Sequence, residues 1–402
     1  MDLRSGCTYW PDLTPNVPRY GPLGRDLSSD VAILGGGITG ALAAYFLTHA
    51  GLHAVMLDRR PVAAGSTAAS TGLLQYELDT LLVDLTERIG QDRALRAYRV
   101  SHDSLERFPE LVQDVGDACG LARRPSLYLA SGDADVDKLR RECEARRSIG
   151  IDVEFLTEGA VRERFPISRP AALWSAKAME VDPYRLTHRL IARAVGRGLE
   201  VFAGTEATTY ESHGDGVTLR TADGPTVRAR HVVFATGYET PAFLADGVCS
   251  CALKSTFAMV SQPLDSFSGW PERCLIWESA HPYFYLRTTP DGRAMLGGED
   301  EDFADPKRRD GLIGAKAQTL AKKFRAMFPA IEMTPDCAWA GTFAETADGL
   351  PYVGTVPQFP RGYFALGYGG NGITFSLVAA RIITDGIMRR PNGDADLFAF
   401  RR

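Results

Sequence analysis

Three glycines close to the N-terminus have the spacing of a dinucleotide-binding turn. Gly35, Gly37 and Gly40 match the pattern GxGxxG within the segment GGGITG. In this pattern the first glycine permits a tight turn, the second lets the backbone approach a pyrophosphate, and the third lets a helix pack closely on a strand. Free N–H groups at the start of the helix favour the phosphates. The motif therefore predicts a phosphate site, to which Ile38 and Thr39 also belong.

The flanking residues predict the strand, helix and second strand that this turn requires. Residues 31–34 form an apolar run typical of a buried parallel strand. Helix-forming residues follow from 41 to 50, and residues 54–57 form a second apolar run. Asp58 ends that run, 18 residues beyond the last glycine of the motif. Its carboxylate can accept hydrogen bonds from a ribose diol.

The arginines after this carboxylate bear on the choice of dinucleotide. Arg59 and Arg60 would suit the 2′-phosphate of NADP, but Asp58 would repel that phosphate. The fingerprint alone leaves FAD and NAD open. We therefore expect Asp58 to bind a ribose, with Arg59 beside it.

Three later segments favour FAD. Residues 65–72 (GSTAASTG) are small and hydroxyl-rich, so they can lie against a planar ring without a clash. The apolar run 231–235 ends in Thr236 and Gly237, where a parallel strand would meet the cofactor. Residues 363–366 lead into the glycine-rich segment 367–372 and then a helix to about 388, which directs a second helix N-terminus at an electron-rich group.

In this order the motifs resemble those of the D-amino-acid-oxidase-like FAD oxidoreductases. That superfamily includes sarcosine oxidase, glycine oxidase and γ-glutamylputrescine oxidase. The matching segments are GGGITG, GSTAASTG, ATG at 235–237, DGLP at 348–351 and GYGGNGIT at 367–374. Tyr9, Trp10 and a Pro-rich lead into the first strand look most like the γ-glutamylputrescine oxidase branch.

The resemblance implies FAD bound in an extended form over about residues 8–390. Ser66 and Thr67 would lie near the pyrophosphate and isoalloxazine, Glu206 and Ala207 by the adenine. The last helix would stabilise negative charge at flavin N1 and C2=O on reduction. The expected cofactor-binding residues are Gly35, Gly37, Ile38, Thr39, Gly40, Asp58, Arg59, Ser66, Thr67, Glu206, Ala207, Thr236, Gly237, Gly370, Asn371, Gly372, Ile373 and Thr374.

This chain departs from its relatives at four positions. Relatives that attach FAD covalently use a His in the GST segment or a Cys before DGLP, and here those positions are Ala69 and Gly341. The resemblance therefore implies non-covalent FAD. The carboxylate anchors of the family, an Arg before DGLP and a Lys on the C-terminal loop, align with Phe343 and Thr374. A simple α-amino acid substrate is thus in doubt, and the nearby Glu345 could suit a cationic amine or be a solvated surface charge.

A β-hairpin around residues 283–296 is the candidate substrate wall. Strand alternation predicts that Tyr283, Tyr285 and Arg287 share one face. Arg287 could bind a carboxylate with its two-pronged guanidinium and so replace the missing anchors. A solvent-facing strand with amphipathic aromatic residues is the alternative. Together with Glu345, these three residues are the candidate catalytic residues.

Composition narrows the function classes. The chain of 402 residues carries a net charge of −5, which excludes a generally basic nucleic-acid binder. Its seven cysteines are odd in number and irregularly spaced, so we expect neither a disulfide framework nor a structural zinc site. We expect a cytoplasmic protein with no signal peptide, no membrane span and no metal. Motifs for zinc, serine and nucleotide hydrolysis are absent from the sequence.

The predicted fold is α/β, or α+β overall, with two domains. A Rossmann-like FAD-binding domain would be assembled from residues 28–105, 176–246 and 335–402. A mixed-sheet substrate domain would take 106–175 and 247–334, with 1–27 as an N-terminal extension. A cleft between domains suits a small substrate. Within the second domain, the charge-rich helix at 136–147 is expected to be solvated.

The predicted reaction is oxidation of a C–N bond in an amine or amino-acid-like substrate. The substrate would lose a hydride equivalent to flavin N5, and the imine would hydrolyse. Oxygen or an unidentified acceptor would reoxidise the flavin. Two alternatives stay open: a dehydrogenase that uses a quinone or protein acceptor, and a low-turnover flavoprotein with a binding or assembly role.

Overall fold

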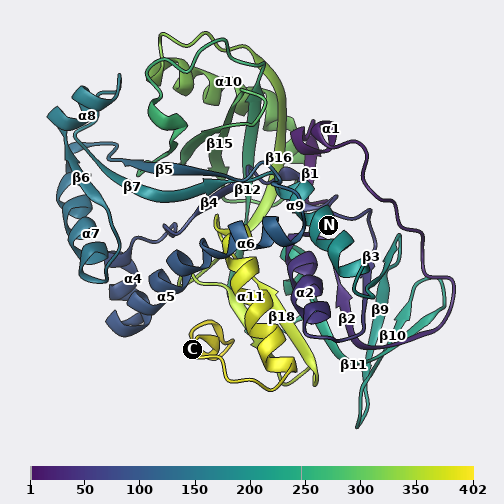
Figure 1. Ribbon diagram of the computed structural model, residues 1–402. Helices are drawn as coiled ribbons and strands as arrows, with labels where there is room; N and C mark the ends of the chain where they lie inside the picture. The colour runs from purple at the N-terminus through teal and green to yellow at the C-terminus, as the bar shows by residue number, and fades with distance from the viewer. Residues whose placement is uncertain (1, 246) are drawn as a thin grey trace.

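The computed structural model describes residues 2–245 and 247–402, and in these ranges the strands form two sheets (Figure 1). The first sheet has the order β17-β18-β11-β2-β3-β8, and β10 joins β9 to β11. Its strands are β2 (Leu27–Leu34), β3 (Ala54–Asp58), β8 (Glu200–Ala203), β9 (Ala207–Ser212), β10 (Val217–Thr221), β11 (Thr226–Phe234), β17 (Tyr352–Thr355) and β18 (Gly362–Leu366).

The centre of this first sheet is the predicted dinucleotide-binding core. Strands β8, β3, β2, β11 and β18 are parallel neighbours. The four strands expected from apolar runs are all present, and in β2 the side chains of Val31, Ala32 and Ile33 are fully buried. Such runs arise because helices cover parallel sheets on both faces. The two-sheet α/β fold expected from the sequence is confirmed.

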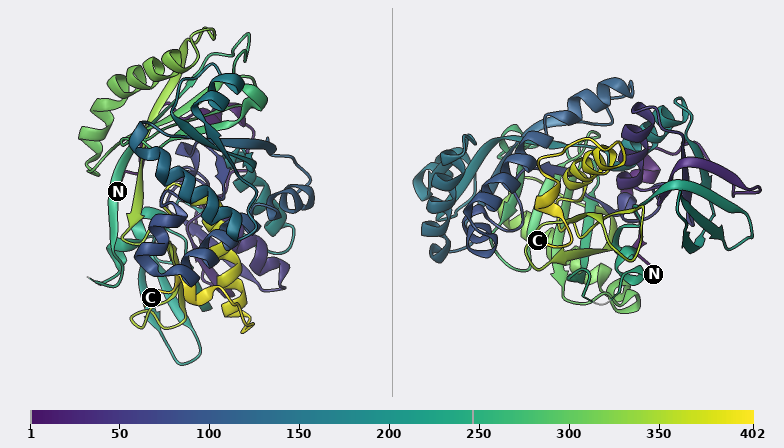
Figure 2. Two further views of the ribbon diagram at one scale, coloured as in Figure 1. Left: turned by 90° about the vertical axis from the view of Figure 1, so that its left-hand side faces the viewer. Right: turned by 90° about the horizontal axis from the view of Figure 1, so that it is seen from below.

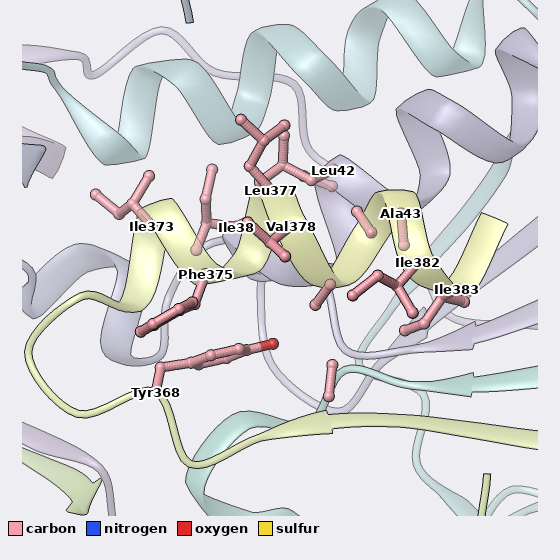
Figure 3. Close-up of a cluster of buried hydrophobic side chains, with 14 of the residues drawn as sticks. Ile38, Leu42, Ala43, Tyr368, Ile373, Phe375, Leu377, Val378, Ile382 and Ile383 are labelled. Carbon is pink, nitrogen blue, oxygen red and sulfur yellow. The ribbon is translucent and has the colours of Figure 1, made fainter. Parts of the chain in front are cut away.

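Helices α2 (Ile38–His49) and α11 (Gly372–Ile387) pack against each other, although more than 300 residues separate them. Figure 3 shows Ile38, Leu42 and Ala43 of α2 facing Leu377 and Val378 of α11. Helix α9 (Pro183–Val195) packs on α2. This apolar contact joins the N-terminal and C-terminal glycine motifs in one layer.

The second sheet is mixed and has the order β1-β16-β12-β15-β14-β13-β5-β7-β4, with β6 on β7. Its strands are β1 (Arg4–Gly6), β4 (Leu73–Gln75), β5 (Ala122–Leu129), β6 (Glu154–Thr157), β7 (Ala171–Glu180), β12 (Cys251–Ser261), β13 (Leu275–Glu278), β14 (Phe284–Thr288), β15 (Ala294–Glu301) and β16 (Pro335–Thr346). The predicted hairpin is β14–β15, in which Tyr285 pairs with Gly297.

Helices flank this second sheet. Helix α10 (Pro306–Met327) packs on β12, β15 and β16 and lies at the top of Figure 1 and the upper left of Figure 2. The shorter helices are α1 (Tyr9–Leu13), α3 (Ser66–Ala69), α4 (Leu82–Ile89), α5 (Gln91–Ser104), α6 (Arg107–Asp114), α7 (Val136–Ser148) and α8 (Glu158–Arg164). No helix in the part of the chain that the structure describes is long and apolar enough to cross a membrane.

The sheets divide the chain differently from the expected domain boundaries in several places. Strand β1 lies in the segment expected to be a separate N-terminal extension, yet it pairs with β16. Strands β4 and β16 lie in segments expected in the FAD-binding domain, yet they belong to the second sheet. At these strands the chain passes from one sheet to the other, so residues from both sheets lie close together where the sheets meet.

Two local expectations differ from the structure. Cys7 and Cys337 form a disulfide that joins β16 to the residue after β1, although the cysteine pattern predicted no disulfide framework. Their separation of 330 residues hides this pairing from spacing arguments. In α7, Glu142 and Arg146 are fully buried and form an ion pair at 2.6 Å, so this helix is not simply a solvated face. The reducing compartment inferred from cysteine usage stays a prediction.

Candidate functional site

One continuous pocket extends from the β2–α2 turn to the second sheet. Its walls include most of the residues singled out from the sequence. Those residues are Gly35, Gly37, Ile38, Thr39, Asp58, Ser66, Thr67, Thr236, Gly237, Gly370, Gly372, Ile373, Tyr283, Tyr285 and Glu345. Gly40, Arg59, Glu206, Ala207, Arg287, Asn371 and Thr374 do not line it.

The glycines of the turn are required by close backbone contacts. Gly35 has a φ of +108°, and a Cβ there would lie 2.4 Å from the carbonyl oxygen of Ala235. A Cβ on Gly40 would lie 1.9 Å from the Gly35 oxygen, so Gly40 serves the helix–strand packing predicted for it and not the pocket surface. The backbone N–H of Ile38 donates to Thr67 Oγ1 at 3.0 Å. The turn therefore presents a rigid helix N-terminus to the pocket.

The Asp58 carboxylate lies at the carboxyl end of β3, where the sequence predicted a ribose acceptor. Its Oδ2 accepts the Gly36 N–H at 2.6 Å and its Oδ1 accepts the Arg60 N–H at 2.7 Å. Each oxygen keeps a further lone pair for a ligand hydroxyl. Burial raises the pKa of Asp58, and the two backbone N–H bonds oppose that rise. The carboxylate is thus oriented before any ligand binds.

The two arginines after Asp58 differ in whether they line the pocket. Arg60 lines the pocket. Arg59 instead forms ion pairs with Glu239 and, at 3.4 Å, with Glu206. The expected contacts of Arg59, Glu206 and Ala207 with the cofactor stay predictions.

The N-terminus of α11 forms the opposite wall. Gly370, Gly372 and Ile373 line the pocket there. The Asn371 side chain turns away and donates to the backbone oxygens of Gln75 and Glu77 at 3.3 and 2.9 Å. Since the first N–H groups of a helix have no partner within it, this end carries a partial positive charge. Asn371 therefore positions the wall rather than forming it.

The pocket residues fit a flat, phosphate-bearing cofactor. The wall from Gly65 to Gly72 carries only small side chains and hydroxyls. Ser66 Oγ and Tyr368 OH are buried without a hydrogen-bond partner, so polar ligand atoms can satisfy them. Ala69 and Gly341 both line this region, and a Cβ on Gly341 would lie 3.5 Å from that of Ala69. No Cys or His is among the described lining residues, which fits a cofactor held without a covalent bond.

The end of the pocket next to the second sheet is aromatic and acidic. Trp277, Tyr283 and Tyr285 form its aromatic wall, and Asp79, Asp300 and Glu345 are its carboxylates. The stacking of Trp277 on Tyr128, with centroids 3.9 Å apart, holds the indole in place. Sequence reasoning found Tyr283, Tyr285 and Glu345 but missed Trp277, Asp79 and Asp300. Of these three, only Asp300 has a local sequence signal, because it is an acid at the end of an apolar strand.

The three carboxylates have unequal surroundings. Glu345 pairs with Lys254 at 2.8 Å. Asp79 accepts the Gly370 N–H at 2.7 Å. Asp300 Oδ1 is buried without a partner, and burial raises the pKa of this carboxyl to about 6. The negative charge at this end of the pocket is therefore only partly balanced by the protein.

Arg287 does not reach the pocket, which corrects the substrate role expected for it. Phe284 and Leu286 point into the core of the second domain, as strand alternation predicted. Arg287 lies on the other face, but its guanidinium is fully buried. Its Nη1 donates to the backbone oxygens of Thr71, Gly72 and Val181 at 2.7–3.1 Å. This guanidinium holds the segment before β4 in place, and it is separated from the pocket by its burial.

Comparisons with known proteins agree with this geometry. Residues 30–386 match the family model described as DAO, FAD dependent oxidoreductase. The chain is 25% identical to a glycine oxidase of Bacillus subtilis over 92% of its own length and 96% of that protein. It is 26% identical to a gamma-glutamylputrescine oxidoreductase of Escherichia coli over 94% and 88% of the two chains.

A solved structure supports the fold independently. The L-proline dehydrogenase of P. horikoshii has a TM-score of 0.79 with 19% identity and covers 94% of this chain and 98% of its own. The match to the family model extends from the strand before the glycine turn to the end of α11 and so includes both walls of the pocket. The chain therefore belongs to the DAO family of FAD-dependent oxidoreductases.

Proposed function

We propose that this protein oxidises the C–N bond of a small amine or amino-acid-like substrate, with non-covalently bound FAD as the electron acceptor. The observation that carries the proposal is the continuity of the pocket. The same cavity is lined by the phosphate-binding turn at Gly37 and by the aromatic wall at Tyr285. A cofactor extended from the turn would therefore expose its ring to a substrate at the wall.

Bound FAD would supply the acceptor for the hydride equivalent that the substrate loses. The chain's own residues supply orientation, exclusion of water and a fixed electrostatic field. The N-terminus of α11, at Gly372 and Ile373, lines the pocket and would offer partial positive charge to a bound flavin ring. The aromatic side chains Trp277, Tyr283 and Tyr285 would cover the reacting carbon.

We also propose that the FAD-binding domain is discontinuous and that a second domain binds the substrate. The cofactor would lie mainly on the parallel sheet, and the substrate would lie against β13–β15 of the mixed sheet. Tyr283, Tyr285 and Glu345 keep their proposed roles in substrate binding. Oxygen, a quinone or a partner protein would then remove the electrons.

The test is anaerobic reduction of the purified yellow holoprotein. A panel of D-amino acids, N-methyl amino acids, proline analogues and γ-glutamyl polyamines is added, and loss of flavin absorbance is followed. Bleaching by one class supports the proposal. Recolouring in air with release of peroxide indicates an oxidase, and bleaching without recolouring indicates a dehydrogenase. A flavin that dithionite reduces but no amine bleaches would contradict C–N oxidation and favour a low-turnover flavoprotein.

A further inference from the structure

At the proposed substrate end of the pocket, the lining residues that the structure describes include carboxylates but no lysine or arginine. Asp79, Asp300 and Glu345 line it, and among the described lining residues the only Lys or Arg is Arg60. Arg60 donates its backbone N–H to Asp58 and its guanidinium to Glu239, at the ribose end. A substrate carboxylate would therefore meet like charges without a guanidinium or ammonium to receive it.

Glu345 already has a counter-charge. Lys254 Nζ lies 2.8 Å from its carboxylate and 3.2 Å from that of Asp302. Lys254 itself does not line the pocket. Glu345 is thus the least available of the three carboxylates for a new ion pair.

Asp300, in contrast to Glu345, has a carboxylate oxygen without a partner. Asp300 lies near the end of β15 and lines the pocket. Its Oδ1 is buried without a hydrogen-bond partner. The Thr256 hydroxyl bonds to the carboxyl group, while Asp79 and Glu345 add negative charge nearby. Because an unpaired buried acceptor is costly, such an atom indicates a ligand donor that completes it.

Asp79 adds a second negative group from another element. It follows β4, and its carboxylate touches the backbone of Gly369 and Gly370, where an added Cβ would lie 2.8–2.9 Å from its oxygens. Lys254 and His281 lie near Asp79, but neither lines the pocket. Asp79 and Asp300 therefore offer two carboxylates, from separate elements, that line the pocket near each other.

The aromatic wall is compatible with a cation between these carboxylates. The rings of Trp277, Tyr283 and Tyr285 border the same end. Aromatic faces attract ammonium groups, more strongly where water is excluded. An acidic and aromatic lining selects positive charge by two separate interactions.

We propose that the substrate carries a second cationic nitrogen, held between Asp79 and Asp300, and no carboxylate at that end. This inference rests on the proposed C–N oxidation. The reacting nitrogen must be neutral for its carbon to lose a hydride equivalent, so a separate group must supply the charge that the two carboxylates bind. The substrate class is a diamine or another amine with a distant ammonium or guanidinium group.

The first experiment measures binding without turnover. The holoprotein is titrated with tert-butylammonium, pivalate and tert-butanol, and changes in the flavin absorption spectrum give each Kd. tert-Butylammonium has no hydrogen on the carbon that bears nitrogen, so it cannot be oxidised. We expect it to bind about tenfold more tightly than pivalate, the difference that one partly buried charge contact supplies. Equal or tighter binding of pivalate would overturn the proposal.

The second experiment compares three amines that share one pentyl chain. Pentylamine, 1,5-diaminopentane and 6-aminohexanoate differ only in a terminal hydrogen, ammonium or carboxylate. We expect 1,5-diaminopentane to reach half-maximal flavin reduction at about tenfold lower concentration than pentylamine, and 6-aminohexanoate to be the poorest. A diamine no better than pentylamine would refute the inference. If no amine reduces the flavin but tert-butylammonium still binds selectively, the proposed oxidation fails and the charge recognition holds.

Variants assign this selectivity to the named residues. Asp300→Asn and, as an independent variant, Asp79→Asn should each reduce the preference for the charged probe to within about threefold of the neutral one. The matched control is Glu301→Gln, one residue along β15 on the other face, where the side chain pairs with Lys316 at 2.7 Å. The control should retain the full preference. Selectivity that survives both Asp variants would overturn the assignment.

Discussion

The ring of Tyr285 lies directly over the backbone of Gly297, its partner across the β14–β15 ladder. A Cβ on Gly297 would lie 2.3 Å from Tyr285 Cζ and 2.4 Å from the hydroxyl oxygen. Gly297 has no unusual φ that would need glycine. The Tyr285 ring is therefore the reason that no side chain fits at this position. The position of this pocket wall is thus set by a residue that does not line the pocket.

Gly297→Ala should therefore displace the Tyr285 ring into the pocket. We expect a lower unfolding free energy by about 1–3 kcal/mol, the usual cost of overpacking, together with weaker substrate binding. Gly314→Ala in α10 is the control, because the space around that glycine is open. Chemical denaturation and the amine concentration for half-maximal flavin reduction measure both effects. An unchanged pocket in the Gly297 variant would show that the ring relaxes elsewhere.

Asp58→Asn should weaken FAD binding about 10–100-fold, because a charged acceptor for the ribose and for the Gly36 N–H becomes neutral. Titration of the apoprotein with FAD, followed by flavin fluorescence, gives the Kd. Asp30→Asn is a suitable control on the same sheet, since its carboxylate accepts only the His53 N–H and pairs with Arg230. Equal affinities for FAD in the two variants would argue against the ribose assignment.

The flavin should separate completely from the protein on acid precipitation. The resemblance to covalent flavoproteins assigns Ala69 and Gly341 to the positions of their attachment residues, and neither residue carries a nucleophile. The absorbance of supernatant and pellet measures the partition. Flavin that remains in the pellet would require a different attachment residue.

Arg287→Lys should destabilise the fold without altering substrate charge preference. The variant loses the guanidinium that bonds Gly72 and Val181, and it weakens the contact with buried Glu180 at 3.6 Å. The loss of hydrogen bonds from a charged donor costs about 1.5–3 kcal/mol each. Denaturation midpoints test the first part, and the pentyl amine series tests the second. A selective loss of carboxylate-bearing substrates at normal stability would restore the original substrate role.

His188 should make the protein less stable in acid. Burial lowers its pKa to about 4, and neither ring nitrogen has a hydrogen-bond partner. Because the folded pKa lies below the ordinary value of about 6.5, stability is complete above pH 6.5 and is lost as the pH falls toward 4. The loss is about 3 kcal/mol at most. His188→Phe should flatten this part of the stability profile, as measured by urea denaturation at pH 8 and pH 4.5, and an identical slope would exclude His188 as the cause.

The sequence by itself determined the dinucleotide-binding half of the site and the family. The glycine turn, the strand before it and Asp58 are local in the chain, and each has a direct steric or hydrogen-bonding reason. The hairpin and the opposite faces of Phe284 and Tyr285 also followed from local alternation. These features need only neighbouring residues, so a pattern can reveal them.

The tertiary structure alone decided the acidic and aromatic end of the pocket. Asp79 and Asp300 come from separate elements and meet only because β4 and β15 belong to the same folded sheet. Arg287 lies on the predicted face, but the Gly72 segment covers it, and local alternation carries no information on what packs above a strand. The burial of Arg146 depends in the same way on distant partners such as Tyr76. Charge and packing across the fold are long-range properties, and they assign these side chains to structure or to the site.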